Sequence, residues 1–162
     1  MKRTRGEIPT RRISGKPSAR QKLFFASRAR YTAYGGARGG GKSWALRRKL
    51  AALCLRYPGI RCLLIRRSYA ELDANHVRPL LAEYGELITY RAAERTLSFP
   101  NGSSISLGYC AADRDVLRYQ GQEYDVIAID EATQLSEYQF SVLKACLRGV
   151  GSYPRRMYLT CN

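Results

Sequence analysis

A glycine-rich turn that ends in lysine and serine is the part of this sequence best suited to chemistry. Residues 36–43 read GARGGGKS and fit the pattern G-x-x-x-x-G-K-[ST]. Glycines let a backbone turn so that its N–H groups face phosphate oxygens, and a helix that begins there adds the positive end of its dipole. The pattern predicts a phosphate-binding loop, made of Gly36, Ala37, Arg38, Gly39, Gly40, Gly41, Lys42 and Ser43.

Two residues at the end of this loop have predicted roles in nucleotide chemistry. Lys42 is expected to reach the β- and γ-phosphates of ATP and so to act in catalysis. Ser43 is expected to offer its hydroxyl to Mg²⁺, which prefers oxygen ligands. A flexible glycine linker is the alternative interpretation. A linker, however, does not place Lys-Ser at the start of an amphipathic helical pattern such as Trp44, Leu46 and Leu50.

A pair of carboxylates follows the strongest strand pattern in the sequence. Four apolar residues, 126–129, run directly into Asp130 and Glu131. A carboxylate at the edge of a buried strand needs a cation or hydrogen-bond donors. Asp130 is therefore expected to belong to the magnesium site, and Glu131 to orient or deprotonate the attacking water as a catalytic residue. The alternative is an acidic helix cap, but together with Lys42 and Ser43 the pair predicts Mg²⁺-dependent ATP hydrolysis.

The elements that would position these residues alternate between strand and helix patterns. Such alternation predicts an α/β fold, with a mostly parallel sheet flanked by helices. Strands are predicted at residues 29–36, 60–67, 87–90, 124–132 and 155–162, and a hairpin with an Asn101-Gly102 turn at 96–110. Helices are predicted at 42–57, 68–85 and 136–149, the second of them capped by Ser68 with Glu71 at the capping-box position.

Charge divides the chain into two parts and indicates the class of partner. The sequence has 28 Lys and Arg against 13 Asp and Glu, a formal net charge of +15. Ten of these basic residues lie within residues 1–30, where Glu7 is the only acid. Residues 1–17 are expected to be a disordered basic arm, or only a solubilising tail, ahead of one domain at 18–162. A polyanion, nucleic acid first of all, is the expected partner.

The sequence also carries no pattern typical of a secreted or membrane protein. No apolar run approaches the roughly 20 residues of a bilayer span, and the basic start leads into no apolar leader. The five cysteines form no CxxC pair, which indicates neither a disulfide framework nor a zinc site. We expect a soluble, cytosolic protein without a membrane partner.

Several segments together resemble the ATPase domain of the large terminase subunit of tailed bacteriophages. The matching segments, from about residue 18 to the end, are ARYTAYGGARGGGKSWALRRKL, IRCLLIRRSYAEL, FPNGSSISLGYC, YQGQEYDVIAIDEATQLSE and MYLTCN. The resemblance implies a P-loop NTPase fold of the RecA/ASCE-like type and a motor that drives double-stranded DNA into an empty procapsid. It also implies a small terminase subunit and a portal protein as partners, a homo-oligomeric ring, and the host cytoplasm as location.

The resemblance assigns further residues. Arg38 matches an arginine that terminases often carry inside the phosphate loop, where it would stabilise γ-phosphate charge as a catalytic group. Gln21 resembles the glutamine that recognises adenine, because an amide both donates and accepts hydrogen bonds. Thr160 and Asn162 resemble the coupling motif that senses the γ-phosphate from an adjacent strand.

The sequence departs from the family in its length. Family members continue past this point into further ATPase strands and a nuclease domain, whereas the chain stops at Asn162. We therefore expect an incomplete ATPase domain without nuclease activity. Ring motors often borrow an arginine from the neighbouring subunit, and the candidates are Arg66, Arg67, Arg91, Arg95 and Arg114.

Other conspicuous residues are expected to be structural, and two other functions remain open. His76 is predicted to lie on the surface, and residues 47–49 (Arg-Arg-Lys) to form a solvated helix face. The DEAT segment at residues 130–133 suggests a helicase-type ATPase as one alternative, although a translocating helicase needs a second lobe. A non-catalytic remnant that binds DNA and nucleotide is the other.

Overall fold

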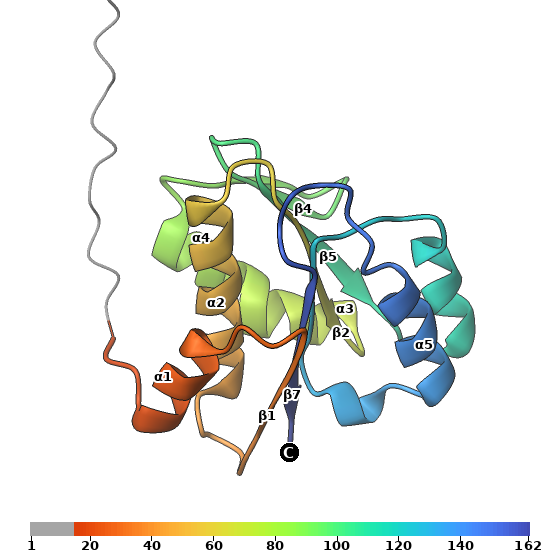
Figure 1. Ribbon diagram of the computed structural model, residues 1–162, viewed down its shortest axis with the longest axis horizontal. Helices are drawn as coiled ribbons and strands as arrows, with labels where there is room; N and C mark the ends of the chain where they lie inside the picture. Colours follow the sequence, from red (N-terminus) through yellow and green to blue (C-terminus); the bar gives the residue numbers. More distant parts are fainter. Residues whose placement is uncertain (1–14) are drawn as a thin grey trace, which may run out of the picture.

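A seven-stranded mixed sheet organises the computed structural model, which describes residues 15–162 (Figure 1). The strands are β1 (Tyr31–Gly35), β2 (Arg61–Arg66), β3 (Thr89–Arg91), β4 (Thr96–Ser98), β5 (Ser104–Tyr109), β6 (Val126–Ile129) and β7 (Arg156–Cys161). Their order across the sheet is β1-β7-β6-β2-β5-β4-β3. The first five strands in this order are parallel, whereas β4 and β3 join by antiparallel pairing.

Helices pack on both faces of this sheet, as its parallel part requires. They are α1 (Ala19–Ala26), α2 (Lys42–Arg56), α3 (Tyr69–Leu72), the π-helical turn η1 (Asp73–Val77), α4 (Arg78–Tyr84), α5 (Glu137–Ala145) and the 3₁₀ turns η2 (Asp113–Tyr119) and η3 (Ala132–Gln134). Helices α1 to α4 lie on one face, and α5 with η2 lies on the other (Figure 1). No helix within residues 15–162 is long and apolar enough to cross a bilayer.

The two central strands carry the core on both of their faces. Side chains of β2 and β6 alternate between two apolar clusters, so Leu64 packs toward α2 and Leu63 toward α5. The two strands are parallel, with Ile65 opposite Ile129. Because parallel strands end at the same edge of a sheet, the residues that follow Ile65 and Ile129 are brought together there.

The predicted α/β class and the order of strands and helices are confirmed, including the antiparallel hairpin of β4 and β5. Local features differ from the prediction, among them the 3₁₀ turns η2 and η3, which were not predicted. Helix α1, which Ser18 caps through Gln21, was not predicted, and the helix expected at 68–85 is interrupted by the π turn η1. Most of the arm predicted at residues 1–17 lies outside the described residues.

Candidate active site at the carboxyl edge of the sheet

The glycine-rich loop joins the carboxyl end of β1 to the first residue of α2, as predicted. Gly39 and Gly41 have φ angles of 78° and 70°, a region that residues with a Cβ rarely adopt. At Gly41 space is limited as well, because an added Cβ would lie 2.5 Å from the side-chain nitrogen Nε2 of Gln21. The loop therefore needs its glycines for both backbone angle and close approach.

Lys42 lies folded under the loop. Its Nζ donates hydrogen bonds to the carbonyl oxygens of Gly36 at 2.5 Å and Ala37 at 2.8 Å, and the residue is 8% exposed. These acceptors are neutral, so a phosphate oxygen in the loop would be a stronger partner for the ammonium group. The lysine is thus placed to bind an anion held by the loop.

Asp130 is the centre of a buried polar cluster at the end of β6. Its carboxylate accepts hydrogen bonds from Ser43 Oγ at 2.9 Å, Arg66 Nη1 at 2.8 Å and His76 Nε2 at 2.8 Å, and also from the Thr160 hydroxyl. Burial alone would raise the pKa of Asp130, but the hydrogen bonds from His76, Thr160 and Ser43 outweigh it and lower the pKa below the usual value. The carboxylate is therefore ionised at neutral pH.

Glu131 follows with a backbone conformation that is unusual for its residue type. Its φ of 55° lies in the left-handed region, where strain is often found at functional sites. Its N–H donates to Thr160 Oγ1 at 3.0 Å, and its carboxylate accepts from Arg66 Nη2 at 3.2 Å and Gln134 Nε2 at 2.5 Å. Thr160 thus joins Asp130 to Glu131, which fixes the direction in which both carboxylates leave the strand.

A cavity of about 200 Å³ collects most of the predicted site residues. Its lining consists of Arg38, Gly39, Gly40, Gly41, Lys42, Ser43, Trp44, Asp130, Glu131 and Asn162. Gly36 and Ala37 are not in the lining, but their carbonyl oxygens accept hydrogen bonds from Lys42, which is. Thr160 is fully buried behind Asp130. The structure therefore brings the predicted loop, carboxylates and Asn162 into one place.

The two predicted magnesium ligands fit such an ion. Ser43 Oγ and the ionised Asp130 carboxylate are in contact at the cavity wall and supply only oxygen donors. Mg²⁺ in nucleotide sites takes one or two protein oxygens and fills its octahedron with phosphate oxygens and water. Ser43 and Asp130 therefore meet the requirement without a larger cluster of acidic side chains.

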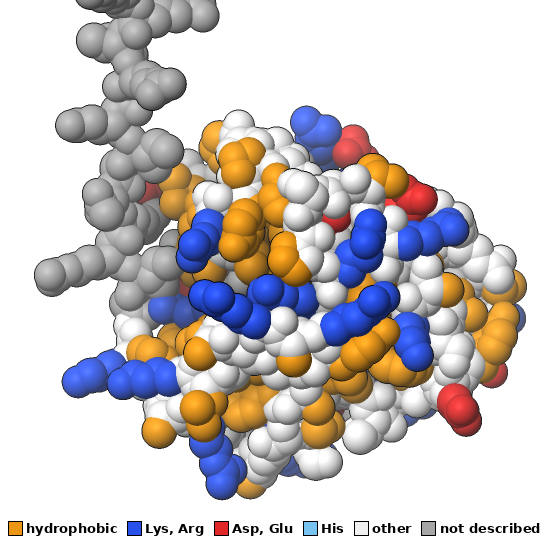
Figure 2. Space-filling model, viewed as in Figure 1, with side chains coloured by type: hydrophobic (Ala, Val, Ile, Leu, Met, Phe, Trp, Pro, Cys, Tyr) orange, Lys and Arg blue, Asp and Glu red, His pale blue; other side chains and the backbone are white. Residues whose placement is uncertain are grey.

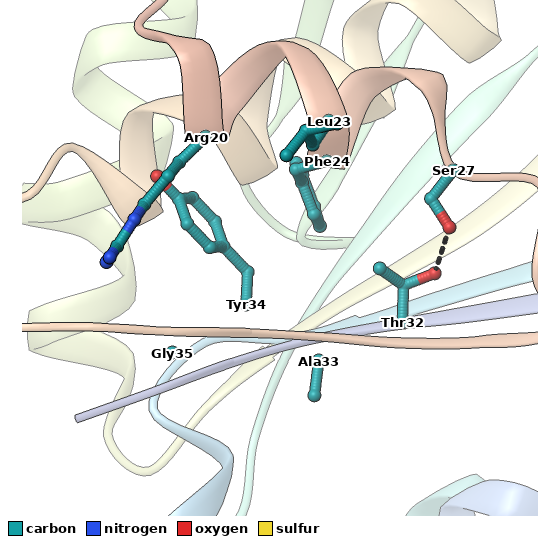
Figure 3. Close-up of a pocket in the computed structure, with 8 residues that line it drawn as sticks. All are labelled: Arg20, Leu23, Phe24, Ser27, Thr32, Ala33, Tyr34 and Gly35. Carbon is teal, nitrogen blue, oxygen red and sulfur yellow. Dashed lines mark hydrogen bonds between the residues drawn. The ribbon is translucent and has the colours of Figure 1, made fainter.

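Gln21 and the adjoining hollow lie next to the start of the loop. The Gln21 side chain donates to the Gly41 carbonyl at 3.1 Å and accepts from the Ser18 N–H at 2.8 Å, so both ends of its amide are engaged. A neighbouring hollow of about 440 Å³ lies between α1 and β1 (Figure 3). In it Arg20 lies alongside the ring of Tyr34, and Phe24 stacks on Tyr34 with ring centroids 5.2 Å apart.

The prediction that His76 lies on the surface is wrong. The residue is fully buried, because the π turn of η1 adds one residue to the helix and directs the imidazole toward Asp130. Burial lowers the pKa of His76 more than the Asp130 carboxylate raises it, and Arg47 and Arg66 lower it further. The ring is therefore neutral, with the Nε2 proton donated to Asp130 and a buried Nδ1 that has no partner within residues 15–162.

Two predictions about arginines are also corrected. Arg66 was a candidate for insertion into a neighbouring subunit, but it is 7% exposed and pairs with Asp130 and Glu131 of its own chain. Residues 47–49 do not form a solvated face: Lys49 is 7% exposed, and the side chains of Arg47 and Arg48 are 11% and 10% exposed because they pack against Glu83.

Arg66 and His76 are therefore functional candidates whose place in the site the sequence reasoning missed. Arg66 had a usable signal, because it ends a buried strand in the same way that Asp130 does, and parallel neighbours share their carboxyl edge. His76 had none, because its orientation depends on a π turn that no residue pattern announced.

Residues 33–162 match the family model described as terminase large subunit, T4likevirus-type, N-terminal. The chain belongs to this family. The resemblance drawn from the motifs is thereby confirmed, and the terminase match begins inside β1, so it includes the loop and both carboxylates. No protein in a search of curated sequences matches the chain.

Solved phage terminases share the fold of this terminase-family chain. The large terminase from a thermophilic bacteriophage, in complex with ATP-gamma-S, superposes with a TM-score of 0.73 at 15% identity, covering 90% of this chain and 38% of that protein. The large terminase ATPase domain of Thermus phage P74-26 gives 0.64 at 16%, covering 92% and 66%. The HK97 bacteriophage large terminase gives 0.67 at 12%, covering 91% and 33%. These likenesses show that the chain shares the fold of phage large terminases. The chain spans well under half the length of the first and third of these proteins.

Proposed function

We propose that this chain hydrolyses ATP with Mg²⁺ and acts as the motor domain of a phage large terminase that packages double-stranded DNA into a procapsid. The observation that carries the proposal is the convergence of Lys42, Ser43, Asp130 and Glu131 on one cavity at the carboxyl edge of the sheet. A phosphate loop with two carboxylates across from it is the arrangement that phosphoryl transfer to water needs.

Each residue has a distinct task in this proposal. The loop N–H groups and Lys42 hold the phosphates, and Arg38 stabilises charge on the γ-phosphate from the same cavity. Ser43 and Asp130 hold Mg²⁺, which when bound neutralises phosphate charge. Glu131 orients the attacking water and accepts its proton, since its carboxylate is the one in the cavity that is partly exposed, at 25%.

The remaining assignments come from the family resemblance and complete the proposal. Asn162 lines the cavity, which suits a γ-phosphate sensor, with Thr160 linking that sensor strand to Asp130. Gln21 lies against the loop, and to contact adenine its side-chain amide would exchange its hydrogen bonds with the Gly41 carbonyl and the Ser18 N–H for the purine edge. The purine would lie in the hollow between α1 and β1, beside Tyr34 (Figure 3). The partners would be double-stranded DNA, the small terminase subunit and the portal, with a homo-oligomeric ring assembling in the host cytoplasm.

The decisive experiment is ATP hydrolysis by the purified chain at several Mg²⁺ concentrations, with and without duplex DNA. Lys42→Ala and Glu131→Gln should each reduce turnover at least about 100-fold, because one removes the phosphate contact and the other the base. Lys42→Ala should also abolish nucleotide binding, whereas Glu131→Gln should keep it. Lys144→Ala and Glu137→Gln, which alter exposed residues outside the cavity, are the matched controls. Nucleotide binding that survives Lys42→Ala unchanged would refute the proposed site.

A further inference from the structure

A second cavity, larger than the candidate nucleotide site, lies at the opposite edge of the sheet. It measures about 740 Å³ and is formed by the end of α1, the second half of α2 and the first residue of β7. Its lining residues are Phe25, Ala26, Ser27, Arg28, Arg48, Lys49, Ala52, Leu53, Arg56, Tyr57, Tyr84 and Arg156. We call it the basic groove. It is separated from the phosphate loop by the length of β1, about 17 Å for five residues.

The basic groove concentrates positive charge. Of the lining residues in the described part of the chain, none is acidic and five are cationic: Arg28, Arg48, Lys49, Arg56 and Arg156. Arg48 has a carboxylate partner, Glu83 at 3.3 Å, which lies outside the lining. In the view of Figure 2, Lys and Arg side chains lie across the middle of the molecule, whereas most acidic side chains lie toward its upper and right-hand parts.

The polar groups at the base of the groove are only partly satisfied. Among residues 15–162, the partners of Lys49 Nζ are two backbone carbonyls, those of Phe25 and Ser27. Burial, followed by repulsion from Arg156, lowers the pKa of Lys49 to about 8. The buried Nε atom of Arg156 and the hydroxyl of Tyr84 have no hydrogen-bond partner within residues 15–162. An anion in the groove would relieve the repulsion between Lys49 and Arg156.

The geometry points to the sugar–phosphate backbone of double-stranded DNA as the occupant, and we propose that the basic groove is a DNA-contact surface. Arg28 and Arg56 are exposed at its rim, while Lys49 and Arg156 lie deeper, so the charge extends across the groove. A single phosphate would engage one or two of these cations, whereas duplex DNA carries one charge per roughly 1.7 Å of its axis. Guanidinium groups also match phosphate geometry. The choice of duplex DNA rests on the proposed packaging function.

The test measures the salt dependence of duplex binding by the full chain without nucleotide. Each phosphate contact contributes about 0.9 to the slope of log K against log salt, so two contacts change affinity about 12-fold between 50 and 200 mM salt. Arg28→Ala/Arg56→Ala should therefore lower the slope by about 2 and leave ATP binding unchanged. Both residues are exposed, so folding should be unaffected, which circular dichroism checks. Lys144→Ala/Arg148→Ala removes the same charge from exposed sites outside the groove and is the control.

Each outcome decides the assignment. A slope reduced by the groove variant and unchanged in the control supports it. An unchanged slope in the groove variant, or equal reductions in both variants, overturns it. Displacement of the duplex by polyglutamate of equal charge would overturn it too, in favour of an acidic protein partner. Failure of ATP hydrolysis with an intact groove effect would count against the proposed ATPase alone, because the two cavities are separate.

Discussion

Replacing His76 by leucine would remove the imidazole that donates to Asp130 while keeping a side chain of similar volume in the core. The hydrogen bond is 2.8 Å long, buried, and directed at an ionised carboxylate. Hydrogen bonds to charged groups contribute roughly 1.5–3 kcal/mol. Because Asp130 keeps Arg66, Ser43 and Thr160, we expect a loss near the lower end, about 2 kcal/mol in the free energy of unfolding. For a chain of this size that lowers Tm by about 4–8 °C.

The pH dependence of stability adds a signature that a simple packing defect would lack. Burial holds the pKa of His76 below its ordinary value of 6.5, so the unfolded chain takes up a proton near that pH and the folded chain does not. Wild-type stability should therefore be complete above pH 6.5 and decrease as pH falls below it, by up to about 1.4 kcal/mol per pH unit. His76→Leu should lack this component.

Urea unfolding of wild type, His76→Leu and His76→Gln at about pH 5.5 and 7.5 would measure both effects. Glutamine carries an amide donor near the position of Nε2, so His76→Gln should retain more stability than His76→Leu. Both variants should raise the Mg²⁺ concentration needed for nucleotide binding, and His76→Gln should raise it by a smaller factor than His76→Leu. Equal stability of wild type and His76→Leu at the higher pH, or a pH dependence that survives in His76→Leu, would refute this account of the cluster.

Two further predictions concern Lys49 and the phosphate loop. Because burial and Arg156 lower the pKa of Lys49 from 10.5 to about 8, the unfolded chain binds more protons at this residue between these values, so the contribution of Lys49 to stability should rise with pH from about 8 to 10.5. Burial raises the pKa values of Cys110, Cys146 and Tyr119, which lowers stability over the same range. The contribution of Lys49 is therefore measured by urea unfolding as the difference in stability between wild type and Lys49→Met, and this difference should grow with pH. Gly41→Ala should cost about 1–2 kcal/mol and weaken nucleotide binding, because left-handed strain of about 1 kcal/mol is joined by displacement of the Gln21 side-chain amide from the loop. Gly59→Ala, also left-handed but facing open space, should cost only about 1 kcal/mol and leave binding intact.

The candidate nucleotide site was largely predictable because its signals are local. The spacing of Gly36, Gly41, Lys42 and Ser43 places a turn, an ammonium group and a hydroxyl at the start of one helix. The buried strand β6 likewise delivers its next residue, Asp130, to the sheet edge whatever lies around it. Strand and helix periodicity then determined the α/β class, because each period marks which face of an element is buried.

The predictions that failed depend on contacts between distant segments. Arg66 looked available to a neighbouring subunit until pairing of β2 with β6 placed it against Asp130 and Glu131, 64 and 65 residues later in the chain. His76 looked like a surface residue because a regular helix was assumed, and a π turn changes the direction of every side chain after it.

By itself, the sequence determined where the glycine-rich loop lies, which strand carries the carboxylates and that the chain is strongly basic, since these follow from residue types a few positions apart and from net charge. Only the tertiary structure decided how Asp130 stays ionised in a buried cluster, and that cations from α2, from β7 and from the segment after α1 meet in one groove. Both depend on side chains from separate elements that share a low-dielectric space. There the charged form of Asp130 is stabilised and the charged form of Lys49 is destabilised, by surroundings that no local sequence pattern specifies.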